Sequence, residues 1–298
     1  MSYDVSLNLA TVRRQWKLPQ AVAAAARHDF AGVAPWRDMV QETGLAEAAR
    51  ILMGSGLRVT GYCRGGLFAA TGPDRLSAAI DDNRRIIDEA AAIGAECVVM
   101  IGGGLAAGSR DLPAARKLFI EGLAAVLPHA RACTMPLALE PLHPMYAADR
   151  GCITTLKEML DIADALGTGG GNGGGGDGGA TDGTGKYGPG NDGLGIAIDT
   201  YHVWWDPELA PQIARAGRRI IAHHICDWLV PTKDLLNDRG MMGDGVIDFP
   251  AIRAMVEAAG YRGIQEVEIF SEDWWGRSGD EVLATAIDRF NRVCCAAV

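Results

Sequence analysis

The sequence lacks several features that would assign it to common classes of protein. No stretch approaches the roughly 20 apolar residues of a membrane-spanning helix, and no apolar run follows the first basic side chains. The seven cysteines are odd in number and form no Cys-x-x-Cys pair, which argues against a disulfide framework or a structural zinc site. Only 28 Lys and Arg stand against 37 Asp and Glu, so the formal charge is −9 and a broad basic surface is not expected. We therefore expect a soluble, cytoplasmic protein that acts on small molecules, without nucleic acid or a membrane as partner.

The sequence also lacks a glycine-rich phosphate loop after its first predicted strand, where it reads ATVRRQWKLPQ (10–20). This absence disfavours an open doubly wound sheet. Short β-rich apolar runs instead alternate with longer helical patterns. The predicted strands are 5–9, 30–35, 58–63, 97–102, 136–141, 194–199, 220–226 and 264–270. The predicted helices are 18–27, 37–55, 74–93, 112–132, 151–166, 207–217, 248–259 and 279–293. A β-α repeat of eight units predicts an α/β protein with a (β/α)8 TIM barrel, formed by 1–298 as a single domain.

Residues 168–193 interrupt this alternation and contain almost nothing apolar. About half of them are glycine, which predicts a flexible insertion before the sixth strand, on the face opposite the expected active site. Its run GGGNGGGGDGG is not a dinucleotide-binding fingerprint, because no strand precedes it and no helix follows. Loop-closure cost grows slowly with length, so a barrel can accommodate such an insertion.

Acidic or imidazole side chains mark the ends of the last four predicted strands: Glu140, Asp199, His224 and Glu268. Catalytic side chains of such barrels project from the carboxyl ends of the strands. Burying an uncompensated carboxylate is costly, so three of them near one rim require a strong positive partner. An oxygen-rich set with one imidazole predicts one divalent metal ion, Mn²⁺, Mg²⁺ or Co²⁺, and would also accept Zn²⁺.

Neighbouring residues leave alternatives to this ligand set open. His223 precedes His224 and points to the other face of the strand, which makes it the poorer ligand. Glu266 shares a face with Glu268 but lies farther from the strand end. His143 suits a pocket wall, or a position behind the ligands, better than a ligand position.

Five runs of sequence together resemble the sugar phosphate isomerase/epimerase family, the xylose isomerase-like TIM barrels. They are LEPLHP (139–144), IDTYHVWWDP (198–207), HHICD (223–227), GDGVIDFPAI (243–252) and VEIFS (267–271). The family includes ketose 3-epimerases, inosose isomerases and dehydratases, hydroxypyruvate isomerases and, more distantly, endonuclease IV. The resemblance spans nearly the whole chain apart from the glycine-rich insertion, and its motifs are specific in combination rather than singly.

The resemblance implies roles for particular residues. The positions that match the family's metal ligands are Glu140, Asp199, His224 and Glu268. His202, three residues after the aspartate, matches a histidine that contacts a substrate oxygen. Tyr146 stands about where several ketose epimerases have a further acidic substrate contact, so their substrate preference is not implied here.

The implied activity is that of a divalent-metal-dependent isomerase, a sugar isomerase or epimerase acting on a sugar or sugar derivative. It would abstract a proton beside a carbonyl and pass through an enediolate, with Glu140 and Glu268 as catalytic acid and base from non-adjacent strands. The alternatives are an inosose-type dehydratase at the same site, an endonuclease IV-like nuclease, or a non-catalytic sugar-binding barrel. The −9 charge and a total of six histidines disfavour the nuclease.

Further side chains are candidates for contact with a small sugar or polyol-derived substrate. Trp204 or Trp205 would wall the pocket, and WWGR (274–277) could close over a sugar ring. A phosphate or carboxylate on the substrate would need basic residues in the loops after the strands. Those available are Arg64, Lys233, Arg239 and Arg277. Aromatic residues and the terminal VCCAAV are compatible with a homo-oligomer, without fixing its number of subunits.

Overall fold

A computed structural model describes residues 3–167 and 193–295, which contain a closed ring of parallel strands. The predicted TIM barrel is confirmed. The strands are β1 (Tyr3–Asn8), β2 (Phe30–Ala34), β3 (Arg58–Val59), β4 (Tyr62–Gly66), β5 (Val98–Ile101), β6 (Leu137–Leu139), β7 (Leu194–Asp199), β8 (Ile220–Ile225) and β11 (Gln265–Val267). Their spatial order is β3-β2-β1-β11-β8-β7-β6-β5-β4.

Nine strands occupy eight barrel positions because the third predicted strand, 58–63, is divided. Its first part, β3, pairs with β2, and its second part, β4, pairs with β5. An isolated bridge between Trp36 and Cys63 and a hydrogen bond from Cys63 N to Pro35 O (3.1 Å) join β4 to the end of β2. The barrel is therefore closed on this side, while β1 and β11 pair in parallel on the other.

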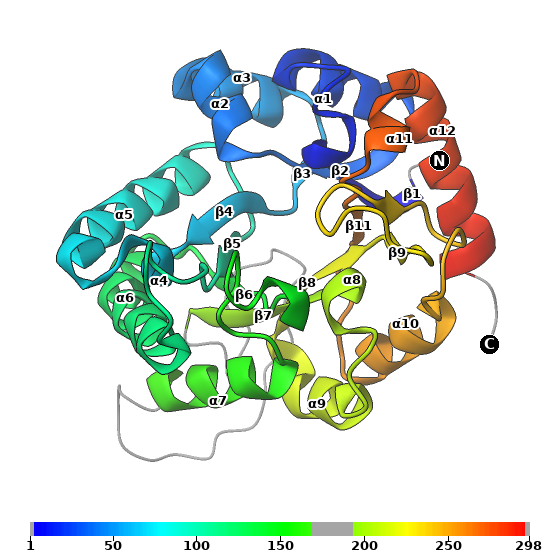
Figure 1. Ribbon diagram of the computed structural model, residues 1–298. Helices are drawn as coiled ribbons and strands as arrows, with labels where there is room; N and C mark the ends of the chain where they lie inside the picture. The colour runs from blue at the N-terminus through cyan, green and yellow to red at the C-terminus, as the bar shows by residue number, and fades with distance from the viewer. Residues whose placement is uncertain (1–2, 168–192, 296–298) are drawn as a thin grey trace.

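Helices surround the strands as a continuous ring (Figure 1). They are α1 (Leu18–Arg27), α2 (Arg37–Thr43), α3 (Leu45–Gly54), α5 (Leu76–Ala92), α6 (Leu112–Ala132), α7 (Leu156–Gly167), α9 (Leu209–Ala216), α10 (Phe249–Ala258) and α12 (Gly279–Arg289). The predicted helix 37–55 is two helices, since Gly44 between them has φ +86°, a conformation that ends α2. Short helices α4 (Phe68–Thr71), α8 (Thr200–Val203) and α11 (Glu272–Trp275) follow strands.

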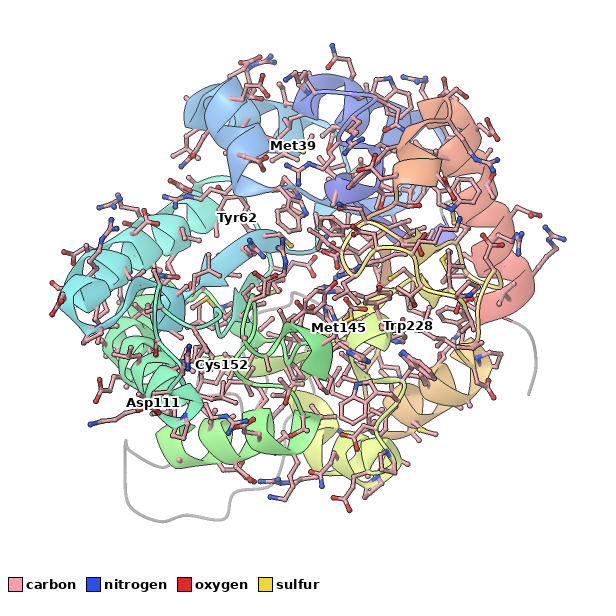
Figure 2. The ribbon with its side chains drawn as sticks, in the orientation of Figure 1. Met39, Tyr62, Asp111, Met145, Cys152 and Trp228 are labelled. Atoms are coloured by element: carbon pink, nitrogen blue, oxygen red, sulfur yellow. The ribbon has the colours of Figure 1, made fainter. Side chains whose placement is uncertain are left out.

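The main apolar core lies between the strands and these helices. Tyr62, labelled in Figure 2, begins β4, is fully buried, and donates its hydroxyl to Glu89 of α5 at 2.9 Å. All four residues of β5 are buried, as expected for a strand covered on both faces. No helix within the described ranges is long and apolar enough to cross a membrane. The predicted glycine-rich insertion, 168–193, lies outside the described residues except for Gly193.

The connection between β8 and α10 contains a structure that the sequence did not predict. Strands β9 (Asp227–Trp228) and β10 (Arg239–Gly240) pair antiparallel as a separate two-stranded sheet. The segment that follows β11 holds β10 through a hydrogen bond from Arg239 N to Phe270 O (2.9 Å) and a bridge between Asp238 and Ser271. Figure 1 shows this connection crossing beside β8 and β11. It brings Arg239 to the carboxyl end of the barrel.

Candidate metal centre and active-site pocket

The interior of the barrel has a floor of small side chains under the polar site. These side chains form a separate buried cluster: Cys97, Ala138, Ala197 and Ala222. Side chains two positions apart on a strand share a face. The residues two positions after the three alanines, toward the carboxyl ends of β6, β7 and β8, are Glu140, Asp199 and His224. The strand geometry therefore directs these three into the barrel one layer above the floor.

Three of the four predicted metal ligands lie close enough to share an ion. One donor atom from each of Glu140, Asp199 and His224 lies within 4.8 Å of the other two, and all three residues are buried. His224 Nδ1 lies 2.9 Å from Glu140 Oε1. This arrangement combines carboxylate oxygens and one imidazole, which is a donor set that divalent metals accept.

Glu268, the fourth predicted ligand, is held beside these three by other partners. Arg239 Nη1 donates to Glu268 Oε2 at 2.9 Å and to Asp199 Oδ2 at 3.2 Å. Asn8 Nδ2 donates to Glu268 Oε1 at 3.0 Å. Glu268 is thus outside the three-residue group, yet Arg239 links its carboxylate directly to that of Asp199.

Asn8 and Glu266 extend the network on the opposite side. Asn8, fully buried at the end of β1, also donates from Nδ2 to Glu266 Oε1 at 2.8 Å. Thr60 Oγ1 donates to Glu266 Oε2 at 2.7 Å, and His224 Nε2 lies 3.5 Å from Glu266 Oε1. Asn8 therefore joins two acids that point into the barrel from the same face of the last strand. Asn8 was not among the predicted site residues, although it ends the first strand just as the predicted metal ligands mark the ends of the last four strands.

The buried charges shift the pKa values of their neighbours. Burial, opposed by Arg239 and reinforced by Glu268 and Glu140, raises the pKa of Asp199 to about 7. Burial alone would lower the pKa of His224, but Glu266, Glu140 and Glu268 outweigh it and hold that pKa well above its ordinary value. Burial also raises the pKa of Glu266. Negative charge in this site is therefore only partly compensated.

The residues present fit a divalent cation. Four buried carboxylates, of Glu140, Asp199, Glu266 and Glu268, face two basic side chains, Arg239 and His224. With all six ionised, four negative charges against two positive ones leave an excess of two negative charges. His224 Nε2 is buried and has no hydrogen-bond partner among the described residues. An excess of acid, with an imidazole nitrogen that makes no hydrogen bond, matches what a metal ion would neutralise and bind.

A pocket of about 300 Å³ opens beside this network and reaches several of the predicted site residues. Glu140, Glu268, His202 and Arg64 line it. His202 Nε2 lies 3.4 Å from Asp199 Oδ2, and its buried Nδ1 has no hydrogen-bond partner among the described residues. Burial, assisted by Arg239, lowers the pKa of His202, so its ring is neutral at neutral pH. The pocket volume is in the range of small-molecule sites.

Two predicted substrate-binding residues, Trp204 and Arg277, lie outside the pocket lining. Trp204 is not in the pocket lining; its ring packs on Trp228 at 5.6 Å between centroids. Trp228 is labelled in Figure 2. Arg277 is also outside the lining, because its guanidinium lies 4.3 Å from the Trp274 ring centroid and bonds Glu281 at 2.9 Å. Trp275, within the predicted WWGR segment, does line the pocket.

The remaining alternatives are also placed by the structure. His223 points away from the site and packs against Tyr261 at 6.2 Å between ring centroids, and burial lowers its pKa to about 3. His143 is outside the pocket lining and stacks on Trp228 at 4.6 Å. Tyr146 lines the pocket and donates its hydroxyl to Leu235 O.

Arg239 depends on a buried carboxylate that shapes the connection carrying it. Asp227, with no exposed surface, accepts hydrogen bonds from four backbone N–H groups at 2.8–3.0 Å: those of Trp228, Gly243, Gly245 and Ile247. A Cβ at Gly245 would lie 2.0 Å from Trp228 O, so only glycine allows this approach. The runs HHICD and GDGVIDFPAI thus meet in one structural unit, with Asp227 as its centre.

Comparison with known proteins identifies the fold family. The family model described as xylose isomerase-like TIM barrel matches residues 22–170 and 188–293. The crystal structure of protein SMc04130 from Sinorhizobium meliloti 1021 is 54% identical, with 98% of each chain covered and a TM-score of 0.88. The comparison with curated proteins found no match.

Two more distant structures share the fold alone. The IOLI protein, solved with a binding zinc atom, is 16% identical over 97% of each chain, with a TM-score of 0.77. The D-allulose 3-epimerase from Methylomonas sp. is 17% identical, covering 98% of this chain and 99% of its own, with a TM-score of 0.71. Taken with the barrel and its strand-end residues, the family match shows that this chain belongs to the xylose isomerase-like TIM barrel family.

Proposed function

We propose that the protein is a divalent-metal-dependent isomerase or epimerase of a sugar or sugar derivative. The observation that carries this proposal is the position of Glu140 and Glu268, which line one pocket beside the three-donor group. Two carboxylates in reach of a bound molecule, next to a cation site, suit removal and return of a proton beside a carbonyl. Two proteins of the same fold support this proposal by their names, since one is an allulose epimerase and the other was solved with a binding zinc atom.

Glu140, Asp199 and His224 would hold the metal, with Glu268 as the fourth ligand. A divalent ion there would supply Lewis acidity, withdrawing electron density from neighbouring substrate oxygens and making the adjacent C–H more acidic. Arg239 stabilises the carboxylates of Asp199 and Glu268 and adds positive charge to the pocket. Neutral His202 can exchange a hydrogen bond with a substrate hydroxyl without adding charge.

Glu140 and Glu268 come from β6 and from the end of β11, with β7 and β8 between them in the sheet. This separation lets them face a substrate carbon from two sides, one removing a proton and the other returning one. Return to the opposite face of the same carbon gives an epimer, whereas return to the neighbouring carbon gives an aldose–ketose isomerisation. Loss of a β-hydroxyl from the same enediolate would make the enzyme a dehydratase.

The test is deuterium incorporation from D₂O, followed by NMR, into ketoses, inososes and hydroxypyruvate with Mn²⁺ or with EDTA. We expect metal-dependent exchange in at least one compound, and the products distinguish epimerisation, isomerisation and dehydration. Glu140→Gln and Glu268→Gln should each lower the exchange rate about 10²–10⁴-fold. Glu281→Gln, on the exposed side of α12, is the matched control and should exchange as the wild type does. The proposal fails if either site variant keeps full turnover with metal bound.

A further inference from the structure

Arginines line the pocket together with acids of the network. Besides Arg239, the lining contains Arg13, Arg14, Arg64 and Arg150. The same lining contains Glu140 and Glu268 near the candidate metal ligands. The pocket lining therefore combines carboxylates with several guanidinium groups.

These arginines differ in whether a carboxylate already neutralises them. Arg13 pairs with Asp38, and Arg14 pairs with Glu272. Arg64 has no ion pair and no hydrogen bond from its side chain to any described residue; its guanidinium lies 5.7 Å from the ring centroid of Trp36. A guanidinium carries five N–H donors, so this half-buried side chain presents unused donors to the pocket.

Arg150, like Arg64, lacks a strong carboxylate partner. Its partner is the adjacent Asp149 at 3.3 Å, whose side chain is 74% exposed, and such surface pairs contribute little. Arg64 and Arg150 line the same pocket, and burial together with the charge of Arg150, opposed by Glu268 and Glu140, lowers the pKa of Arg64. Two like charges that line one pocket repel each other, and an anion bound between them would relieve that repulsion.

We propose that Arg64 and Arg150 form a subsite for an anionic group, a phosphate monoester or a carboxylate, on the substrate. The inference rests on the proposed function and names its substrate class: a short sugar-derived chain with a carbonyl near one end and an anion at the other. Planar guanidinium donors match the oxygens of either anion.

Aromatic side chains in the pocket lining suit the carbon chain of such a substrate. Trp36, Phe270 and Trp275 line the pocket and pack edge to face, with centroids 5.4 Å apart for Trp36 and Phe270 and 6.0 Å for Phe270 and Trp275. Aromatic faces pack against the C–H groups of a sugar chain while the polar ends are bound separately. The pocket volume of about 300 Å³ fits a small molecule of this kind.

The experiment compares matched anionic and neutral compounds on the full-length, Mn²⁺-loaded protein. D-ribulose 5-phosphate is compared with D-ribulose, and hydroxypyruvate with dihydroxyacetone, by kcat/KM for deuterium exchange. Calorimetric binding of 2-phosphoglycolate and of glycolate is measured alongside, because binding needs no turnover. The variants are Arg64→Gln, Arg150→Gln and the conservative Arg64→Lys; the control is Arg84→Gln, an exposed arginine of α5.

We expect one anionic member to be preferred at least about tenfold over its neutral partner, and the preferred pair identifies phosphate or carboxylate as the anion. Arg64→Gln should raise KM for the anionic compound about tenfold or more. Its kcat, and the KM for the neutral compound, should change less. Arg64→Lys should restore part of the loss. Unchanged anion binding in both Gln variants would overturn the subsite. If no compound exchanges but Arg64→Gln still abolishes 2-phosphoglycolate binding, the subsite stands and the proposed function fails.

Discussion

The carboxyl group of Asp199 lies in a site where burial and neighbouring acids oppose its ionisation. Its pKa is raised from 3.8 to about 7, so the folded protein binds a proton that the unfolded chain releases over that interval. The unfolding free energy of the metal-free protein should therefore fall, through this group, as pH rises from about 4 to about 7. A bound cation would offset this penalty, which connects the pKa of one residue to the proposed metal.

We predict that Asp199→Asn removes this pH-dependent penalty. In EDTA, urea unfolding should show the variant gaining stability relative to the wild type between pH 5 and pH 8, because asparagine does not ionise. Parallel stability profiles for the two proteins over this range would contradict the raised pKa. The same series with Mn²⁺ should favour the wild type instead, since the variant lacks a ligand.

Asn8 is the residue through which Glu266 and Glu268 are held together. Asn8→Ala removes a donor from both buried carboxylates and should lower the unfolding free energy by about 2–3 kcal/mol. It should also reduce deuterium exchange, because Glu268 loses a positioning contact. The measurements are urea unfolding and the exchange assay.

Thr60→Val serves as the control for this prediction, because Thr60 bonds Glu266 and not Glu268. It should lower stability by about 1 kcal/mol and leave exchange within about twofold of the wild type. Equal losses of exchange in the two variants would show that the Asn8 contact to Glu268 has no particular role.

At the scale of elements, the connection between β8 and α10 determines where Arg239 lies. Asp227→Asn keeps the shape of the side chain but replaces one acceptor oxygen with a donor that faces backbone N–H groups. We predict a loss of about 3 kcal/mol in unfolding free energy and a lower exchange rate, since the displaced connection carries Arg239. Asp244→Asn, which breaks only a partly exposed pair with Arg289, should cost less than about 1 kcal/mol. Similar losses in both variants would argue against the special role of Asp227.

The strand ends were the predictable part of this site. Side chains alternate between the two faces of a strand, which places Glu140, Asp199 and His224 on the inward faces of β6, β7 and β8 and turns His223 outward. The sequence pattern alone is therefore enough to predict these positions. The same rule applied to β1 would have found Asn8. Most predicted helices lie close to the observed ones, but α7 begins at Leu156 rather than at 151, α12 ends at Arg289, and Gly44 divides the predicted helix 37–55. One predicted strand, 58–63, is divided into β3 and β4.

The irregular connections were not predictable in this way. Arg239 is positioned by backbone hydrogen bonds to Asp227 and by pairing with the end of the barrel, neither of which leaves a periodic pattern. Trp204 and Arg277 were expected in the pocket because they follow strands, but position after a strand does not fix side-chain direction. Trp204 packs on Trp228, and Arg277, in the bend before α12, bonds Glu281 in the first turn of that helix.

At the scale of the whole molecule, net charge and local charge differ in sign. The chain has a formal charge of −9, yet five arginines line its pocket. Composition alone disfavours polyanions, and it says nothing about a small anion in a cavity. Closure of the barrel by β1 with β11 and by β2 with β4 brings residues from both ends of the sequence into the lining of this cavity, including Arg13 and Glu268.

Anomalous diffraction from crystals of the full chain soaked in Mn²⁺, for the wild type and for His224→Gln, tests the proposed metal site most directly. We expect a single strong peak within bonding distance of Glu140, Asp199 and His224 in the wild type, and a lost or much weakened peak in the variant. A well-ordered wild-type site without a peak, or a peak that persists unchanged when His224 is replaced, would contradict it.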